Sequence, residues 1–216
     1  MDSLEQIQGE MIACRACPRL VAYREEVGRV KKRAYRDWEY WARPVPGLGD
    51  PQARLLVIGL APGAHGGNRT GRVFTGDDSG DFLFRALYKA GFANQPTSKQ
   101  SDDGLVLKDI YITAVCHCAP PENKPTGAEI QTCLPYLVRE LQALRQVQGI
   151  VLLGRIALNG LVKAYQMMGF TLPRIDFAHA SVHYPGKGLP WLITSYHPSR
   201  QNTQTGRLTE AMFDDV

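Results

Sequence analysis

Four short apolar runs recur along the chain, each followed by a loop-forming stretch and a segment with helical periodicity. The runs are residues 54–60, 109–115, 149–153 and 191–195. Runs of this length with little polar alternation are typical of parallel strands that are buried on both faces. Strands that alternate with helices favour a parallel sheet with helices on both sides. The pattern therefore predicts an α/β fold built on these four strands.

The stretches between the runs have the spacing of amphipathic helices. We expect helices over residues 2–12, 18–28, 78–90, 126–144 and 156–167, and a terminal helix over 205–213. The chain has no internal repeat, and 216 residues are enough for one domain with a full core. We therefore interpret residues 1–216 as a single domain.

The distinctive glycines, histidines and asparagines lie just after the predicted strands, in residues 61–77, 116–123, 154–155 and 196–202. Right-handed crossovers bring the carboxyl ends of parallel strands to one edge of the sheet. Ligands bind at this edge in open α/β sheets, so we expect the functional site there.

Charge is unevenly distributed, although the net charge is only +4. Nine basic residues lie between Cys14 and Pro44, against four acidic ones, and Trp38, Tyr40 and Trp41 fall in the same stretch. Basic segments interleaved with aromatic residues are typical of polyanion-binding surfaces. A solvated surface with a few packed aromatic side chains explains the same pattern equally well.

The apolar content is ordinary, at 44%, and no stretch approaches the roughly 20 apolar residues that cross a bilayer. The first residues are polar and acidic, unlike a secretory signal or a transit peptide. We therefore expect an intracellular protein without a membrane partner.

Five cysteines, an odd number, argue against a disulfide framework and favour a metal site. Cys14 and Cys17 form a C-x-x-C pair, which by itself fits a zinc knuckle or a redox pair. With Cys133 and one of Cys116 and Cys118, they offer four thiolates from three segments, which suit a structural zinc or a [4Fe–4S] cluster. Five core cysteines without a metal remain the alternative.

The glycine-rich stretch 59–71 follows the first strand. It lacks the Gly-Lys-Ser/Thr of a nucleotide-binding P-loop and the glycine spacing of the dinucleotide fingerprint. What remains is a backbone that a ligand can approach closely. Phe74, just beyond it, suits either stacking on a flat base or core packing. His197, in a His-Pro-Ser sequence after the last strand, favours a functional histidine.

Five motifs in order resemble the uracil-DNA glycosylase superfamily, and specifically its fifth family, the type B bacterial and archaeal enzymes. They are residues 14–20 (CRACPRL), 59–66 (GLAPGAHG), 71–77 (GRVFTGD), 118–126 (CAPPENKPT) and 195–202 (SYHPSRQN). The resemblance covers nearly the whole chain.

This resemblance implies a three-layer αβα fold with a central four-stranded parallel sheet, and excision of bases from DNA. It implies a [4Fe–4S] cluster held by Cys14, Cys17, Cys118 and Cys133, and leaves Cys116 out. Such a cluster would anchor the basic N-terminal segment, about residues 1–50, beside the sheet. A monomer in the bacterial or archaeal cytoplasm, close to the nucleoid, is the corresponding expectation.

Two positions depart from the related fourth family. Leu60 and Ala61 stand where that family has an acid, and Ala114 stands where it has an asparagine that reads the uracil edge. We therefore expect a less strict reading of uracil, and hypoxanthine or other deaminated bases as further substrates.

The predicted reaction flips the base out of DNA, which costs a few kcal/mol, and cleaves its glycosidic bond to leave an abasic site. His197, as a neutral imidazole, is the expected donor to the departing base, and Phe74 the stacking ring. By resemblance, Asn123 is the expected water ligand. Asp77 is a second candidate, with a helix N-cap as the equally weighted alternative.

Further residues are assigned by their place in these motifs. Gly59, Ala61, Gly63 and Ala114 are expected at the base, whereas His65, Ser199, Arg200, Gln201 and Asn202 are expected to contact DNA. The competing hypothesis is a non-catalytic DNA-binding module stapled by a metal, and the missing acid at Ala61 is the argument for it.

Overall fold

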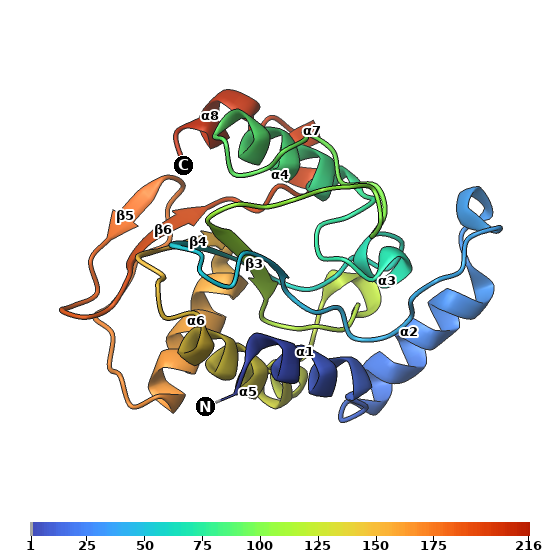
Figure 1. The fold of residues 1–216 in the computed structure, drawn as a ribbon, viewed down its shortest axis with the longest axis horizontal. Helices are drawn as coiled ribbons and strands as arrows, with labels where there is room; N and C mark the ends of the chain where they lie inside the picture. The colour runs from blue at the N-terminus through green and yellow to red at the C-terminus, as the bar shows by residue number, and fades with distance from the viewer. Residues whose placement is uncertain (1) are drawn as a thin grey trace.

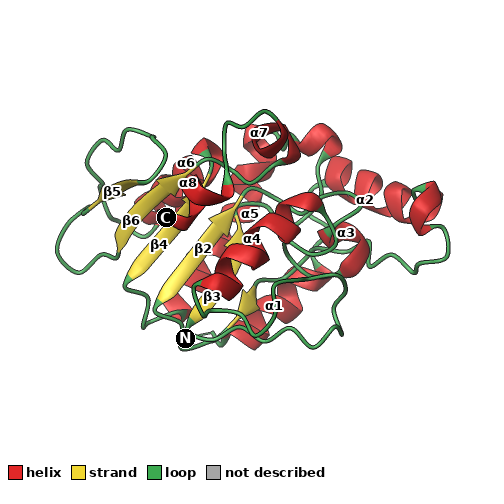
Figure 2. Cartoon of the chain, turned by 90° about the horizontal axis from the view of Figure 1, so that it is seen from above, coloured by secondary structure: helices red, strands yellow, loops and turns green. Residues whose placement is uncertain are grey.

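A six-stranded sheet forms the centre of this computed structural model, which describes residues 2–216 (Figures 1 and 2). The strand order is β1-β3-β2-β4-β6-β5. The inner four strands, β3 (Ile110–Ala114), β2 (Leu55–Gly59), β4 (Gly149–Leu153) and β6 (Trp191–Ser195), are parallel. The four predicted strands are thus confirmed. The short edge strands β1 (Leu48–Gly49) and β5 (Ser181–His183) pair antiparallel and were not predicted.

The inner strands are mostly apolar because both faces of the sheet are covered. In β2, Leu56 and Ile58 enter one hydrophobic core, while Val57 between them enters the other. Strand β4 alternates in the same way, with Leu152 on the first side and Val151 on the second.

Helices cover each face, giving the expected three layers (Figure 1). One layer contains α1 (Leu4–Ala13), α5 (Gly127–Ala143) and α6 (Arg155–Met167), and the other contains α4 (Asp78–Lys89), α7 (Arg200–Gln204) and α8 (Glu210–Asp214). Helix α2 (Pro18–Val30) extends away from the sheet beside α3 (Gly67–Thr70). Two short 3-10 turns, η1 (Arg33–Tyr35) and η2 (Pro121–Asn123), complete the elements.

The predicted terminal helix over residues 205–213 is wrong. Helix α7 ends at Gln204, and Gly206 has a left-handed backbone with φ of 70°. A new helix, α8, starts only after Thr209, whose side chain accepts from the backbone N–H of Met212 and caps it. The glycine therefore splits one apparent helix into two short ones.

No helix in residues 2–216 is both long enough and apolar enough to cross a membrane.

Candidate active site at the carboxyl edge of the sheet

Parallel pairing places the loops after β2, β3, β4 and β6 at one edge of the sheet. The loop after β2 runs through the glycine-rich stretch and α3 to Asp77, where α4 begins. The loop after β6 carries His197. Three predicted site residues, Phe74, Asp77 and His197, therefore come from two loops that meet at this edge.

Asp77 uses its two carboxylate oxygens differently. Its Oδ1 accepts from the backbone N–H of Gly80 at 3.0 Å and caps α4. Its Oδ2 lies against the glycine-rich loop, because a Cβ built on Gly66 would be 1.9 Å from it and one on Gly63 would be 2.8 Å away. The helix cap and a place at the glycine-rich loop are therefore compatible roles of one side chain.

Burial raises the pKa of Asp77 above its usual value, and the neighbouring charges of Asp78 and Asp81 act in the same direction. The hydrogen bond from Gly80 acts against this shift. A carboxylate with little water around it attracts nearby positive charge more strongly than an exposed one. Asp77 is therefore suited to stabilise a cation or to accept a proton.

Phe74 and His197 stack on each other, with ring centroids 5.8 Å apart and planes 28° apart. Phe74 has a left-handed backbone with φ of 49°, which is a strained conformation for an aromatic residue. Its ring lies over the end of β2, since a Cβ on Gly59 would be 2.7 Å from it. Gly59 thus makes room for an aromatic ring at the end of the strand.

His197 is held as a neutral imidazole. Desolvation lowers its pKa to about 4, and its Nδ1 is buried without a hydrogen-bond partner within the described chain. The backbone carbonyl of His197 accepts from Asn202 Nδ2 at 2.8 Å. Asn202 therefore fixes the turn that carries the histidine.

Asn123 comes from a third loop, the one that follows β3. It is exposed at the end of η2, and its φ of 56° places it in the left-handed region, which asparagine tolerates better than most residues. In the part of the chain that the structure describes, its side chain makes no hydrogen bond. Asn123 is therefore exposed on a loop that leaves the carboxyl end of β3.

The residues expected around the base differ in exposure. Ala114 is buried, and it pairs with Gly59 across the β3–β2 register, while Ala61 and Gly63 are half-buried in the loop. None of the four offers a side-chain donor or acceptor to a base edge. These four positions can therefore contribute only shape and backbone groups to a bound ligand.

The residues expected to contact DNA are partly engaged within the protein. Ser199 caps α7 by accepting from the backbone N–H of Asn202, and His65 Nδ1 lies 3.0 Å from the hydroxyl of Tyr40. Arg200 and Gln201 are exposed, with Arg200 3.6 Å from Asp78. Ser199, Asn202 and His65 therefore shape the loops, whereas Arg200 and Gln201 face outward.

The four predicted ligand cysteines line one cavity, together with apolar residues such as Met11, Leu20 and Val21. Cys14 ends α1, Cys17 begins α2, Cys118 follows β3 and Cys133 lies in α5. Cys116 is buried and does not line the cavity, although it hydrogen-bonds to Cys133. The fold thus brings together the four thiols from three distant segments.

Arg24 provides a test of whether this cavity suits a negatively charged group. The Arg24 side chain is only 2% exposed. Its Nη1 donates to Cys118 Sγ at 2.9 Å and its Nη2 donates to the carbonyl of Cys14 at 3.2 Å. Its Nε has no hydrogen-bond partner in the described residues. A buried guanidinium needs negative charge beside it. Neutral thiols do not supply that charge, whereas thiolates bound to iron do, so the residues fit a cluster.

Among residues 2–216, no group of three or more Cys, His, Asp or Glu side chains is arranged closely enough to hold one metal ion. Burial raises the pKa of the Cys118 thiol to about 11, so binding of any metal there must displace protons.

The sequence of the chain matches a known family. The model of the uracil DNA glycosylase superfamily matches residues 46–216. The chain belongs to the uracil DNA glycosylase superfamily. It is 55% identical to the type-5 uracil-DNA glycosylase of Thermus thermophilus, over 95% of this chain and 91% of the relative. The type-5 enzymes of Mycobacterium leprae and Pyrobaculum aerophilum are 49% and 45% identical, over 99% and 95% of this chain and 93% and 87% of theirs.

In this uracil DNA glycosylase superfamily member, the sequence did not predict that Arg72 and Asp103 help to organise the site. Arg72, 6% exposed, donates to Thr75 Oγ1 at 3.0 Å and to Ser98 Oγ at 2.8 Å, and forms an ion pair with Asp103 at 2.7 Å. It thereby ties the segment before Asp77 to the loop between α4 and β3. Arg72 lies within a recognised motif, but nothing in the sequence links it to Asp103.

Proposed function

We propose that this chain is a DNA repair glycosylase that flips uracil out of DNA and hydrolyses its N-glycosidic bond, leaving an abasic site. The observation that carries this proposal is the stacking of the neutral His197 ring on Phe74. The desolvated carboxylate of Asp77 follows Phe74 by three residues in the same loop. A flat ring, a neutral hydrogen-bond donor and a carboxylate are the groups that this reaction needs. The type-5 relatives support uracil as the base.

The departing base develops negative charge on its oxygen as the bond from C1′ breaks. His197 donates a hydrogen bond to that oxygen, and Phe74 stacks on the flipped ring. A preorganised donor of this kind contributes roughly 3 kcal/mol to the transition state. The low pKa of His197 keeps it from protonating the base outright.

Positive charge develops on the sugar at the same time. Asp77 stabilises it electrostatically, and Asn123 holds the water from the rim of the site. The water adds to C1′, the base leaves with the electron pair of the broken bond, and the proton of the water passes to Asp77. The raised pKa of Asp77 favours this transfer.

We also propose that Cys14, Cys17, Cys118 and Cys133 hold a [4Fe–4S] cluster, with Arg24 as its buried counter-charge. Through a bound cluster, these four cysteines would tie the N-terminal helices α1 and α2 to α5 and to the loop after β3. Purified protein should show the broad visible absorbance of an iron–sulfur cluster, which Cys14→Ser and Cys118→Ser abolish and Cys116→Ser retains. A colourless native protein that contains zinc would overturn this assignment.

Substrate range follows from the lack of side-chain amides or carboxylates at Ala61 and Ala114. With recognition left to shape and backbone groups, the pocket should accept hypoxanthine and other deaminated bases besides uracil. A panel of duplexes with different central lesions measures this range. Strict selectivity for uracil would contradict it.

We further propose that the protein acts as a monomer in the cytoplasm, where its type-5 relatives from bacteria and archaea would meet chromosomal DNA. Light scattering during gel filtration tests the oligomeric state. A dimer at micromolar concentration would contradict the monomer.

Single-turnover excision tests the main proposal. Uracil-containing duplex is incubated with excess protein and then treated with alkali, which breaks the strand at abasic sites. His197→Ala and Asn123→Ala should each lower the rate about tenfold or more, while Lys163→Ala, exposed on α6, serves as control. No strand breaks with the wild-type protein would favour the non-catalytic DNA-binding module.

A further inference from the structure

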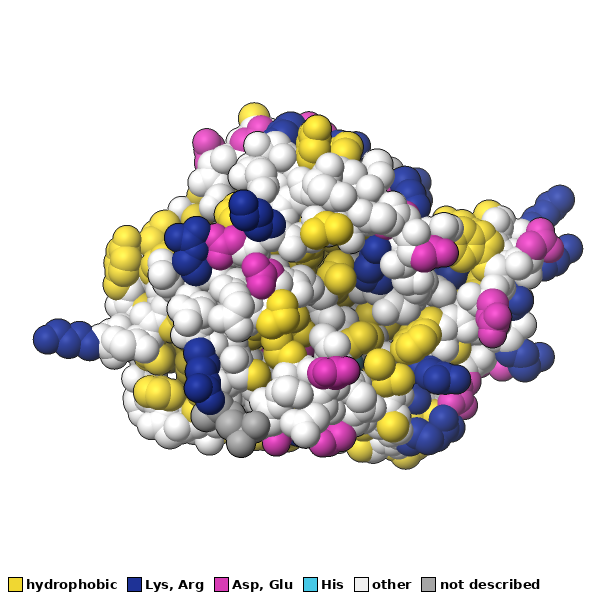
Figure 3. All heavy atoms as spheres, viewed as in Figure 1, with side chains coloured by type: hydrophobic (Ala, Val, Ile, Leu, Met, Phe, Trp, Pro, Cys, Tyr) yellow, Lys and Arg dark blue, Asp and Glu magenta, His cyan; other side chains and the backbone are white. Residues whose placement is uncertain are grey.

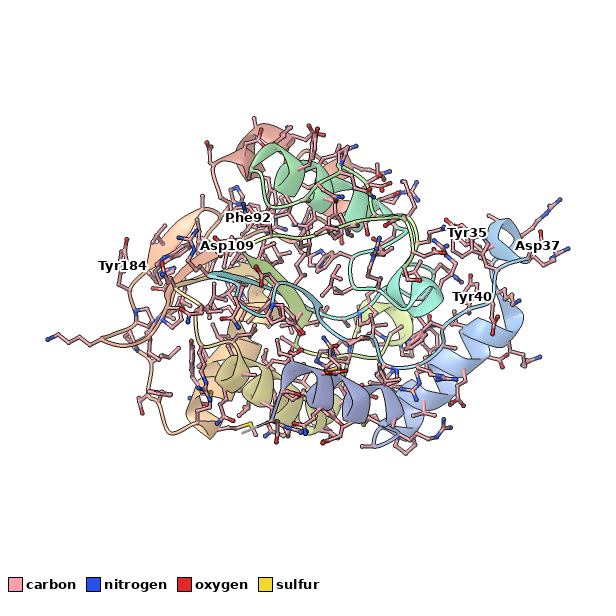
Figure 4. The ribbon with its side chains drawn as sticks, in the orientation of Figure 1. Tyr35, Asp37, Tyr40, Phe92, Asp109 and Tyr184 are labelled. Atoms are coloured by element: carbon pink, nitrogen blue, oxygen red, sulfur yellow. The ribbon has the colours of Figure 1, made fainter. Side chains whose placement is uncertain are left out.

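The chain forms a projection directly after α2. Residues 31–39, called the arm from here on, include η1 and extend beyond the body of the molecule (Figure 1). Figure 4 shows Asp37 at its outer tip, with Tyr35 and Tyr40 nearer the body. The catalytic proposal above does not use this segment.

The basic side chains of the arm have no acidic partners. Lys31, Lys32, Arg33 and Arg36 form no ion pair within residues 2–216. In contrast, the acidic residues of α2 are occupied, because Glu25 pairs with Arg15 and Glu26 with Arg29.

Most of this charge is at the surface. Lys32, Arg33 and Arg36 are exposed, and Figure 3 shows lysine and arginine side chains concentrated at this end of the molecule. The two acidic residues of the arm, Asp37 and Glu39, leave it with a net positive charge. These four cations are therefore available to an external polyanion.

Arg69 fixes the arm to the active-site loops. Its guanidinium contacts two aromatic rings of the arm that stand nearly perpendicular to each other, 3.9 Å from the centroid of Tyr35 and 4.1 Å from that of Trp38. The same side chain donates to the carbonyl of His65 at 2.7 Å and to that of Gly76 at 2.9 Å. Arg69 is 3% exposed, so these contacts are shielded from water.

The end of the arm is joined to the same loop by further bonds. Tyr40 Oη lies 3.0 Å from His65 Nδ1, and the backbone N–H of Trp41 donates to the carbonyl of Arg69 at 3.0 Å. The arm thus has a defined position relative to the glycine-rich loop and to Gly76, the residue before Asp77. A surface fixed in this way loses little entropy on binding.

We propose that the arm binds the phosphates of duplex DNA beside the flipped nucleotide, and that Arg69 sets its position relative to the catalytic loop. This inference rests on the proposed glycosylase function, which supplies a duplex at the adjacent edge. Each phosphate that a protein cation neutralises releases counterions, which makes binding steeply dependent on salt.

The test compares two variants with equal loss of charge. The arm variant carries Lys31→Gln, Lys32→Gln, Arg33→Gln and Arg36→Gln. The matched control carries Lys108→Gln, Lys163→Gln, Arg174→Gln and Lys187→Gln, at exposed positions on α6 or on loops that precede β3, β5 and β6. Binding of undamaged duplex is measured across salt concentrations from about 50 to 200 mM.

For the arm variant, the slope of log K against log salt should fall by about 0.9 for each lost phosphate contact, or about 2 to 4 in all. The control should change by less than about 1. Equal slopes for the two variants would overturn the proposal and would point to an acidic protein as the partner of the arm. Single-turnover excision by the control variant should stay near the wild-type rate, whereas absence of excision in the wild type would instead refute the glycosylase function.

A second variant tests the role of Arg69 without removing charge. Tyr35→Ala with Trp38→Ala deletes both rings that contact Arg69, and both positions lie outside the two hydrophobic cores of the sheet. Affinity for duplex should fall about tenfold because the four cations lose their fixed position, while circular dichroism should show that the variant is still folded. Wild-type affinity in this variant would show that Arg69 does not position the arm.

Discussion

The Oδ2 atom of Asp77 lies so close to Gly66 that a Cβ at that position would be 1.9 Å from it. The carboxylate therefore fits beneath the glycine-rich loop only because residue 66 has no side chain. This contact explains why the loop has glycine at position 66. It also defines the first of four predictions.

Gly66→Ala should push the Asp77 carboxylate out of its place and lower single-turnover excision about a hundredfold. Gly9→Ala is the control, since a Cβ at Gly9 in α1 meets nothing within 4 Å. That change should leave excision unaltered and stabilise the protein by about 0.5–1 kcal/mol. Full activity in Gly66→Ala would remove Asp77 from the site.

The two oxygens of Asp77 can be tested separately. Asn is as good an N-cap as Asp, so Asp77→Asn should keep α4 and the melting temperature close to wild type while it removes the charge. Asp77→Ala should lose both the charge and the helix cap, and loss of the cap should lower the free energy of unfolding by about 1 kcal/mol. If the role is the cap alone, Asp77→Asn will excise uracil at the wild-type rate, and the proposed electrostatic role is wrong.

The imidazole of His197 should stay neutral throughout the working range of pH. Its pKa of about 4 in the folded protein lies below the usual 6.5, so the unfolded chain binds more protons between these values. Stability should therefore fall as pH drops from about 6.5 towards 4, and His197→Asn should reduce this loss. Nitrogen NMR of labelled histidine measures the ring directly, and titration near 6.5 would contradict the prediction.

Glu140 should give the opposite dependence on pH. It is fully buried in α5, it accepts from Thr113 Oγ1 at 2.6 Å, and burial raises its pKa from 4.5 to about 8. The folded protein then binds more protons than the unfolded chain between these values, so stability falls as pH rises through this window.

Glu140→Gln should remove this dependence, so its melting temperature relative to wild type should increase from about pH 5 to about pH 8. Glu5→Gln, exposed on α1, is the matched control. A difference that does not change with pH would show that Glu140 titrates normally.

The sequence predicted those helices and strands that are long enough to show a pattern of apolar and polar positions. Strands β2, β3, β4 and β6 are apolar on both faces, and α4 and α5 have capping residues, Asp77 and Thr126, at their first turns. The edge strands β1 and β5, of two and three residues, are too short to show alternation. The helix break at Gly206 was missed because one glycine does not always end a helix.

The site was predictable to the extent that its residues follow strands. Phe74, Asp77 and His197 lie where the parallel topology brings strand ends together. The hydrogen bond from Asn202 to the carbonyl of His197 and the ion pair of Arg72 with Asp103 depend on how loops fold over each other. No spacing rule predicts such contacts, so their roles emerged only from the structure.

The ion pair between Arg72 and Asp103 has a consequence for anyone who would shorten the loop between α4 and β3. Most of that loop is exposed and looks dispensable, yet Asp103 supplies the only acid paired with Arg72 within the described residues. A trimmed protein would keep its core and lose the partner of a buried cation next to the catalytic segment. Such a minimised enzyme would need an acid grafted back at that point.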